Sequence, residues 1–264
     1  MKIKYSEFTV AFALITSASA WAQTPTGREV MEAYKEQDRT EDTASEMRMS
    51  IINARGGTRE RKLTVWSITR DNDTEMQLIR FLAPADVKGT GFLSIENLDR
   101  EDDNFLYLPA LRKTRRIAGS DKQDRFVGTH FTYEDLESEE LDAYTYALIG
   151  SETLDGSDTW IVEAVPTDPD KIKETAYSKR ELWISKDHAL ILQAKYFDRE
   201  GAYVKRLRAR DVRQVPGANK WRAYHLTMED VLKGSKTVIE ILTYDIDQGV
   251  SEDYFTQRYL TRRG

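Results

Sequence analysis

The chain has 264 residues, no cysteine, a formal net charge of −6 and 32% charged residues. Without cysteine there can be no disulfide framework, thiolate metal site or thiol nucleophile, and the acidic balance argues against non-specific nucleic-acid binding. We expect a soluble mature chain, because no later stretch approaches the roughly 20 apolar residues that a membrane span needs.

The first 22 residues have the layout of a secretory signal peptide. Two lysines precede a short apolar stretch over residues 8–15, and small residues follow, ending in Ala20-Trp21-Ala22. A basic start, an apolar centre and an A-x-A site are the parts of such a signal. We predict cleavage after Ala22, with a cut after Ala20 as the alternative, and a mature domain over residues 23–264 that works outside the cytoplasm.

The first predicted element of the mature chain is a helix over residues 26–39. Thr26 is a candidate N-cap, Glu29 stands three residues later, and apolar residues recur at Val30, Met31 and Tyr34. The Thr-x-x-Glu spacing is that of a capping box, in which each side chain bonds the backbone of the other residue.

Strand patterns occupy nearly everything between residues 46 and 245. Residues 46–51 alternate polar and apolar side chains, which places one strand face in water and the other in a core. Further strand patterns follow at residues 63–69, 75–82, 92–98, 105–108, 113–118, 144–149, 159–165, 180–185, 190–197, 203–212, 221–229 and 237–245. Tight turns between neighbours indicate antiparallel pairing, and residues 167–175 are expected to form a surface loop.

A second helix is predicted over residues 251–260, where acids begin the segment and bases end it, as the helix dipole favours. A shorter turn is expected over residues 131–136. The fold class is therefore mainly β (α+β): one domain with a single long antiparallel sheet and few helices. An open sheet of more than about ten strands usually curls or closes, so this one either closes into a filled barrel or curves into a gutter that holds something else.

Three strings in the first half of the chain carry a family resemblance. They are FLAPADVKGTGFL at residues 81–93, LYLPALRKTRRI at residues 106–117 and GTHFTYEDL at residues 128–136. Together they resemble the outer-membrane lipoprotein-sorting protein family of LolA-like proteins, in the branch associated with RND-type (MMPL-like) transporters. The resemblance covers essentially the whole mature chain and implies a strongly curved, LolA/LolB-like half-barrel whose concave face is plugged by a few helices.

The same resemblance implies a periplasmic carrier of lipid or lipoprotein acyl chains rather than an enzyme. It implies no cofactor, no nucleic acid, transient membrane contact and an RND/MMPL-type inner-membrane transporter as partner. The alternative is an accessory subunit of such a transporter that carries nothing. A hydrolase is a third hypothesis, but the sequence has no serine elbow, metal motif or cysteine nucleophile.

Apolar side chains are the candidates for lining an acyl-chain groove. They are Met47, Met49, Trp66, Phe81, Phe92, Phe105, Tyr107, Phe126 and Phe131. Each methylene that they bury would contribute about 0.8 kcal/mol, and methionine suits a groove that accepts variable chains. The alternative for each of them is ordinary core packing.

The basic run Arg112, Lys113, Arg115 and Arg116 is the sharpest local charge on this acidic chain. It predicts a docking patch for lipid phosphates or an acidic transporter surface, or else a solvated edge strand. On a strand, Lys113 and Arg115 would point one way, and Arg112 and Arg116 the other. Acids between residues 134 and 142 could neutralise the run; their spacing is not that of a calcium loop, which favours a solvated charged turn.

The three histidines stand far apart, at His130, His188 and His225, and none lies in a metal-ligand motif. We expect structural or surface roles for them. Gly89-Thr90-Gly91 lacks the third glycine of a nucleotide fingerprint, so it predicts a tight turn or a close backbone approach.

Overall fold

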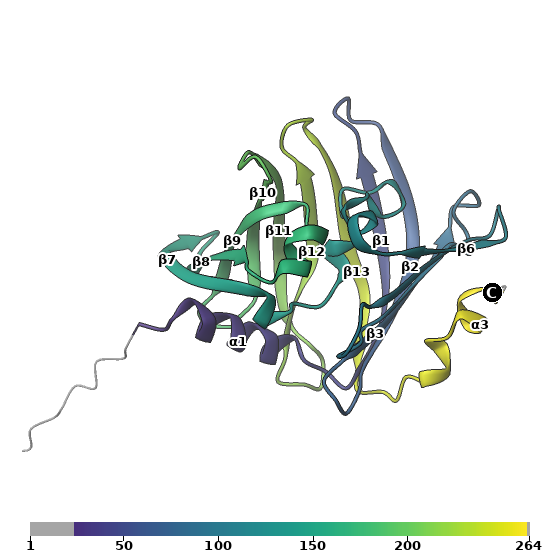
Figure 1. Cartoon of the computed structure of the whole chain (residues 1–264), viewed down its shortest axis with the longest axis horizontal. Coiled ribbons are helices and arrows are strands. Elements are labelled where there is room, and N and C mark those ends of the chain that lie inside the picture. The colour runs from purple at the N-terminus through teal and green to yellow at the C-terminus, as the bar shows by residue number, and fades with distance from the viewer. Residues whose placement is uncertain (1–23, 263–264) are drawn as a thin grey trace, which may run out of the picture.

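One antiparallel sheet of 13 strands dominates the computed structural model, which describes residues 24–262. Its strand order is β6-β5-β4-β3-β2-β1-β13-β12-β11-β10-β9-β8-β7. The sheet is strongly curved and does not close, so β6 and β7 are its two edges (Figure 1). The predicted fold class is confirmed. The predicted signal peptide, residues 1–22, lies outside the described residues.

Every predicted strand pattern forms a strand. They are β1 (Asp42–Ile52), β2 (Thr58–Thr69), β3 (Glu75–Ala83), β4 (Gly91–Ile95), β5 (Asp103–Leu108), β6 (Lys113–Ile117), β7 (Tyr144–Leu154), β8 (Ser157–Pro166), β9 (Tyr177–Ser185), β10 (Ile191–Asp198), β11 (Tyr203–Gln214), β12 (Trp221–Asp230) and β13 (Ser235–Ile246). Two wings of consecutive hairpins meet where β1 pairs with β13, with Met49 opposite Ile239. This pairing joins the two ends of the chain into one sheet.

Helix α1 (Gly27–Asp38) lies across the concave side of the sheet (Figure 1). Thr26 and Glu29 form the predicted capping box, with the Glu29 backbone N–H donating to Thr26 Oγ1 at 3.2 Å. Val30 and Met31 are buried against the core. Glycine is required at position 27, because a Cβ there would lie 2.7 Å from the carbonyl oxygen of Tyr146 in β7. Helix α1 therefore packs directly on the backbone of an edge strand.

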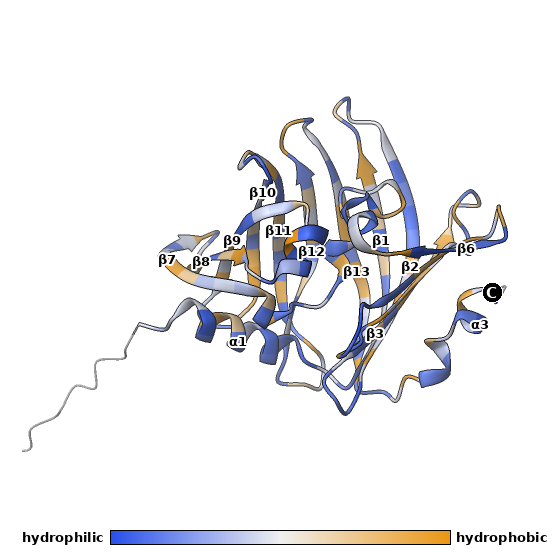
Figure 2. Ribbon diagram, viewed as in Figure 1, coloured by the Kyte–Doolittle hydropathy of each residue, from blue (hydrophilic) through white to orange (hydrophobic). Residues whose placement is uncertain are grey.

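The main core lies on the concave face and draws buried residues from both wings of the sheet. Residues 118–143, which follow β6, run inside the half-barrel, and we call them the plug segment. It contains the short 3₁₀ turns η1 (Gly119–Gln123), η2 (Phe126–Gly128), η3 (Glu134–Leu136) and η4 (Leu141–Ala143). Phe126 is 1% exposed and contacts Phe81, Phe92 and Tyr133. Figure 2 shows the strands banded by hydropathy, as expected where alternate side chains face opposite sides.

A second core lies on the convex face, under the C-terminal segment (Figure 1). The single helix predicted over residues 251–260 is wrong: a 3₁₀ turn, η5 (Glu252–Tyr254), is followed by the short helix α3 (Gln257–Leu260). The helix is interrupted because Phe255 is buried against the sheet and Thr256 caps a new helix by accepting from the Tyr259 N–H. Leu260 is fully buried, and a Cβ at Gly91 would lie 2.7 Å from its side chain.

Sequence patterning missed one helix. Residues 167–175 contain α2 (Pro169–Glu174), which begins with Asp168 as N-cap and proline in its first turn. That pair is a recognised start signal. Helix α2 contacts η1 of the plug segment. None of the helices within residues 24–262 has the length and apolarity to cross a membrane.

Candidate functional site

A cavity of about 500 Å³ lies between α1, the concave face of β1–β3 and residues 136–141 of the plug segment. Small-molecule sites in proteins typically measure about 300–1,000 Å³. The cavity exists because the plug segment fills the concave face near β4–β6 while α1 reaches across from the side of β7. The gutter predicted from the sequence is therefore only partly filled by its own chain.

Part of the cavity lining is apolar, and an adjoining part carries hydroxyl groups. The apolar wall is formed by Tyr34, Met47, Val65, Leu136 and Leu141, and the hydroxyl wall by Thr43, Ser45, Ser67 and Thr69. Both sets face inward because alternate residues of β1 and β2 point to the same side. Two of the hydroxyls satisfy one another, as Thr43 Oγ1 and Ser67 Oγ lie 2.8 Å apart. The lining therefore suits an amphiphile better than a purely apolar molecule.

Ion pairs and tyrosines surround the mouth beneath α1. Arg222 of β12 pairs with Asp38 at the end of α1, and Arg39 pairs with Asp73 at 2.5 Å. Tyr34 and Tyr244 also line this region, and burial raises the pKa of each phenol above its usual value. Both tyrosines stay neutral at physiological pH, so they offer hydroxyl groups rather than charges.

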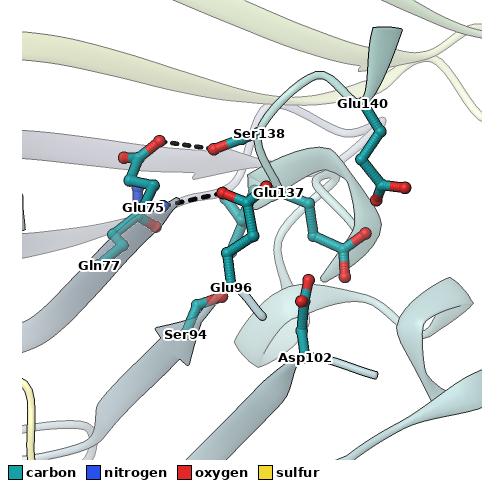
Figure 3. A pocket seen from close by; sticks show the side chains of 9 residues that line it. Glu75, Gln77, Ser94, Glu96, Asp102, Glu137, Ser138 and Glu140 are labelled. Atoms are coloured by element: carbon teal, nitrogen blue, oxygen red, sulfur yellow. Dashed lines mark hydrogen bonds between the residues drawn. The ribbon is translucent and has the colours of Figure 1, made fainter. Parts of the chain in front are cut away.

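A small recess of about 20 Å³ adjoins the cavity on the side of β3 and β4 (Figure 3). Its lining includes the carboxyl groups of Glu75, Glu96, Asp102, Glu137 and Glu140. Figure 3 shows that Glu75 is held from two sides: Ser138 Oγ donates to its carboxylate at 2.5 Å, and its own backbone N–H donates to Glu96 at 2.8 Å. The recess is large enough for about one water-sized group.

Burial changes the acidity of this recess. It raises the pKa of Glu75, against the lowering effect of the Ser138 hydroxyl. It also raises the pKa of Asp102 to about 6, although the Asn97 backbone N–H opposes the shift. Within residues 24–262, no group of three or more His, Asp or Glu side chains is placed to hold a metal ion.

Buried ion pairs hold Asp135, Glu137 and Glu139 of the plug segment, so the expectation of a solvated charged turn is wrong for most of this acidic stretch. Asp142, at its end, is 95% exposed. Glu139 receives two bonds from Arg180 of β9, at 2.8 and 3.0 Å. Burial alone would raise the pKa of Glu139, but Arg180 lowers it below the usual value. Asp135 pairs with Lys205 at 2.5 Å, and Glu137 pairs with Lys122 at 2.9 Å.

These pairs attach the plug segment to the sheet and to α2. Lys171 of α2 bonds Glu137 at 3.3 Å and Glu140 at 3.1 Å. Breaking one buried pair by removing a single partner typically costs about 3–5 kcal/mol. The plug segment is therefore a fixed part of the fold, and α1 is the element that covers the cavity.

The structure places the nine candidate lining residues in three locations. Met47 lines the cavity. Met49, Phe81, Phe92, Phe126 and Phe131 belong to the core beneath the plug segment. Trp66, Phe105 and Tyr107 lie on the convex face, against the C-terminal segment. The set is not brought together into one groove, because alternate strand positions face opposite cores and the plug segment covers most of the concave ones.

The four residues of the basic run also differ in their surroundings: two form ion pairs and two are exposed without one. Arg115 pairs with Asp121 at 2.7 Å, and Arg116 pairs with Glu101 at 3.2 Å. Acids near residues 101 and 121 thus neutralise these two arginines, not the stretch at 134–142. Arg112 lies in the β5–β6 turn with φ of +50°, and Lys113 begins β6. Both are exposed and have no ion-pair partner within residues 24–262.

The histidines carry structural contacts. His130 is 6% exposed, with Nδ1 2.8 Å from Thr237 Oγ1 and Nε2 2.8 Å from Ser235 Oγ, and burial lowers its pKa to about 4. His188 stacks on Trp221. Gly89 has φ of +82° in the β3–β4 turn, so the turn predicted at residues 89–91 is confirmed.

Sequence reasoning missed the hydroxyl wall and the recess. In β1, threonine and serine at alternate positions 43 and 45 look like the wet face of a strand. The useful signal would have been their register, since Thr43 pairs with Ser67 and Ser45 with Val65. Four hydroxyl side chains that face inward from adjacent strands are unusual in a packed core, so this register would have indicated a cavity.

Comparison with known proteins supports the architecture and assigns the family. A family model described only as that of an uncharacterized protein matches residues 73–262. A domain described as an outer membrane lipoprotein-sorting protein from Vibrio parahaemolyticus matches with a TM-score of 0.82 and 31% identity, covering 89% of this chain and 98% of that one. A DUF1329 family protein from Desulfovibrio piger matches with a TM-score of 0.83 and 34% identity, covering 89% of this chain and 97% of that one.

A LolA superfamily protein from Nitrosomonas europaea shares the fold, with a TM-score of 0.70 at 18% identity, covering 89% of this chain and 100% of that one. No curated protein sequence matches the chain significantly. The curved sheet with its plugged concave face indicates the same family as the two relatives above 30% identity. The chain therefore belongs to the family of these two relatives, the outer membrane lipoprotein-sorting (DUF1329) proteins, and it has a LolA-like fold.

Proposed function

We propose that the protein is a non-enzymatic carrier that holds an amphiphile, such as a lipid or a lipoprotein acyl chain, in the cavity beneath α1. The observation that carries the proposal is the cavity itself, about 500 Å³ in a chain whose relative from Vibrio parahaemolyticus is described as a lipoprotein-sorting protein. Met47, Val65 and Leu141 would take the apolar part of the cargo. Its polar part would face the hydroxyl wall.

Helix α1 is the element that could open without unfolding the sheet. It contacts β7, β8 and the η4 turn, and its outer residues Glu32, Lys35 and Glu36 line the cavity while remaining exposed. Transfer would then need only a receiver with higher affinity and a population in which α1 is displaced. We further propose that this occurs in the periplasm, after removal of residues 1–22.

Lipid binding by the purified mature chain tests the proposal. Organic extraction and mass spectrometry should recover a bound lipid, and an apolar fluorescent dye should bind competitively with added lipid. Val65→Trp places a ring inside the cavity and should weaken dye binding about tenfold, the equivalent of about 1.4 kcal/mol.

Leu242→Trp is the matched control, because it adds the same ring on β13 at a position that is 49% exposed and does not line the cavity. It should bind the dye as the unmodified chain does. The carrier proposal fails if no lipid or dye binds, or if both variants bind equally well.

We propose a docking role for only two residues of the basic run. Arg112 and Lys113, at the start of β6, are exposed and free to contact an acidic surface, whereas Arg115 and Arg116 are neutralised internally. We propose that these two residues contact an RND-type transporter, the partner implied by the sequence resemblance. Reversing both charges should abolish pull-down of that transporter and leave dye binding unchanged; unaltered pull-down would reject this contact.

A further inference from the structure

The recess beside the cavity has negative charge and hydrogen-bond acceptors, but few groups that balance them. Glu75, Glu96 and Asp102 have no ion-pair partner in the described part of the chain, whereas neighbouring Glu137 is held by Lys122 and Lys171. All three line the recess, and Figure 3 shows Glu75 turned toward Ser138, Asp102 beside Glu137, and Glu96 between them. Burying carboxylates without a cation is costly.

Two buried amide oxygens also lack donors. Gln77 lines both the recess and the cavity, and its Oε1 is buried without a hydrogen-bond partner. Asn104 of β5 is 1% exposed; its Nδ2 bonds Glu137 at 3.4 Å, while its Oδ1 has no partner. Of these two residues only Gln77 lines the recess. Buried polar atoms are normally satisfied, so the unpaired Gln77 oxygen indicates a donor supplied from elsewhere.

The cavity continues this acidic character toward its mouth. Its basic lining residues are Lys35, Arg39 and Arg222, and two of them are already engaged, Arg39 with Asp73 and Arg222 with Asp38. An anionic head group entering here would meet carboxylates with little compensation. A head group that brings positive charge and N–H donors would satisfy both the carboxylates and the orphaned Gln77 oxygen.

From this juxtaposition we propose that the cavity selects amphiphiles with an amine head group, whose ammonium enters the recess beside Glu75, Gln77 and Glu96 while the chain lies along Met47 and Val65. The inference rests on the proposed carrier function and adds the chemical class of its cargo. The size of the recess, about 20 Å³, suits the primary ammonium group of an alkylamine.

Competition between three probes of equal chain length tests the proposal. Dodecylamine, dodecanol and dodecanoic acid are each titrated near neutral pH against an apolar dye bound to the mature chain. Dodecylamine should displace the dye at a concentration at least about tenfold lower than dodecanoic acid, because like-charge contact is strongly unfavourable. Dodecanol should fall between them.

The double variant Glu75→Gln with Glu96→Gln keeps the side-chain shapes and removes the charge. It should reduce the preference for dodecylamine over dodecanoic acid to less than about threefold while dodecanol binding stays the same. Glu46→Gln with Glu60→Gln is the matched control, because both residues are exposed and neither lines the cavity or the recess. It removes equal charge and should keep the preference.

The outcomes separate the two proposals. If none of the three probes displaces the dye, the carrier function itself fails. If all bind but dodecanoic acid or dodecanol equals dodecylamine in the unmodified chain, the carrier function stands and the amine preference is rejected, whether or not the variants fold.

Discussion

Phe126 offers the strictest test of the claim that the plug segment is a fixed part of the fold. Its ring is 1% exposed and lies 5.8, 5.6 and 5.6 Å, between ring centroids, from Phe81, Phe92 and Tyr133. Truncating a buried phenylalanine to alanine typically costs about 3–5 kcal/mol, and aromatic pairs add stability beyond the area they bury. We expect Phe126→Ala to lower the free energy of unfolding by about 4 kcal/mol.

Urea unfolding of the mature chain, followed by tryptophan fluorescence, measures this loss. The transition should move to lower urea with little change in slope, since the surface exposed on unfolding is nearly the same. Ile149→Ala is the control, because Ile149 is 50% exposed and should change stability by no more than about 0.5 kcal/mol. A loss below about 1 kcal/mol for Phe126→Ala would refute a fixed plug segment and favour a loosely seated lid.

Three further predictions follow from single sites. His130→Gln should make stability less dependent on pH, because the folded pKa of His130, about 4, lies below the unfolded value of about 6.5. Between pH 7 and pH 5 the unmodified chain should therefore lose about 2 kcal/mol more stability than the variant. Urea midpoints that fall by the same amount in both proteins over this pH range would contradict the prediction. Gly27→Val should displace α1, because the added atoms meet the backbone of Tyr146. Protease cleavage within α1 should then become faster, and an unchanged cleavage rate would be evidence against the packing of α1 on β7. Leu260→Ala should cost about 2–5 kcal/mol, since the side chain is fully buried on the convex face, and a change under about 0.5 kcal/mol in urea unfolding would show that the C-terminal segment does not pack as described.

The strands and α1 could be predicted because their signals are local. Alternation over a few residues identifies each strand, tight turns identify the hairpins, and Thr26 with Glu29 marks the helix start. The pairing of β1 with β13 could not be read in this way. It depends on contacts between the two ends of the chain, which no short window contains.

The candidate lining set shows why the site was harder to predict. In β5, Phe105 and Leu106 are consecutive and apolar, yet Phe105 faces the convex core and Leu106 the concave one. Both faces of β4 and β5 carry packed apolar side chains, because the C-terminal segment covers one and the plug segment covers the other. Apolar character alone therefore does not distinguish the face that holds the cavity.

The acidic stretch of the plug segment fails to match expectation for a related reason. Its partners Lys171, Arg180 and Lys205 come from α2, β9 and β11, far along the chain from Glu137, Glu139 and Asp135. A window over residues 134–142 shows only like charges, which are typical of a solvated turn. The compensation becomes visible only once the sheet brings these elements together.

Photolabelling tests the central claim, an amphiphile held between α1 and the concave face, most directly. A dodecylamine or fatty acid analogue with a diazirine near the chain end is bound to the mature protein, irradiated, and mapped by peptide mass spectrometry. The account predicts adducts on Tyr34, Met47 or Val65, which line the cavity, and their loss when unlabelled amphiphile competes. Saturable adducts confined to Trp66 or Tyr107, beneath the C-terminal segment on the convex face, would contradict it.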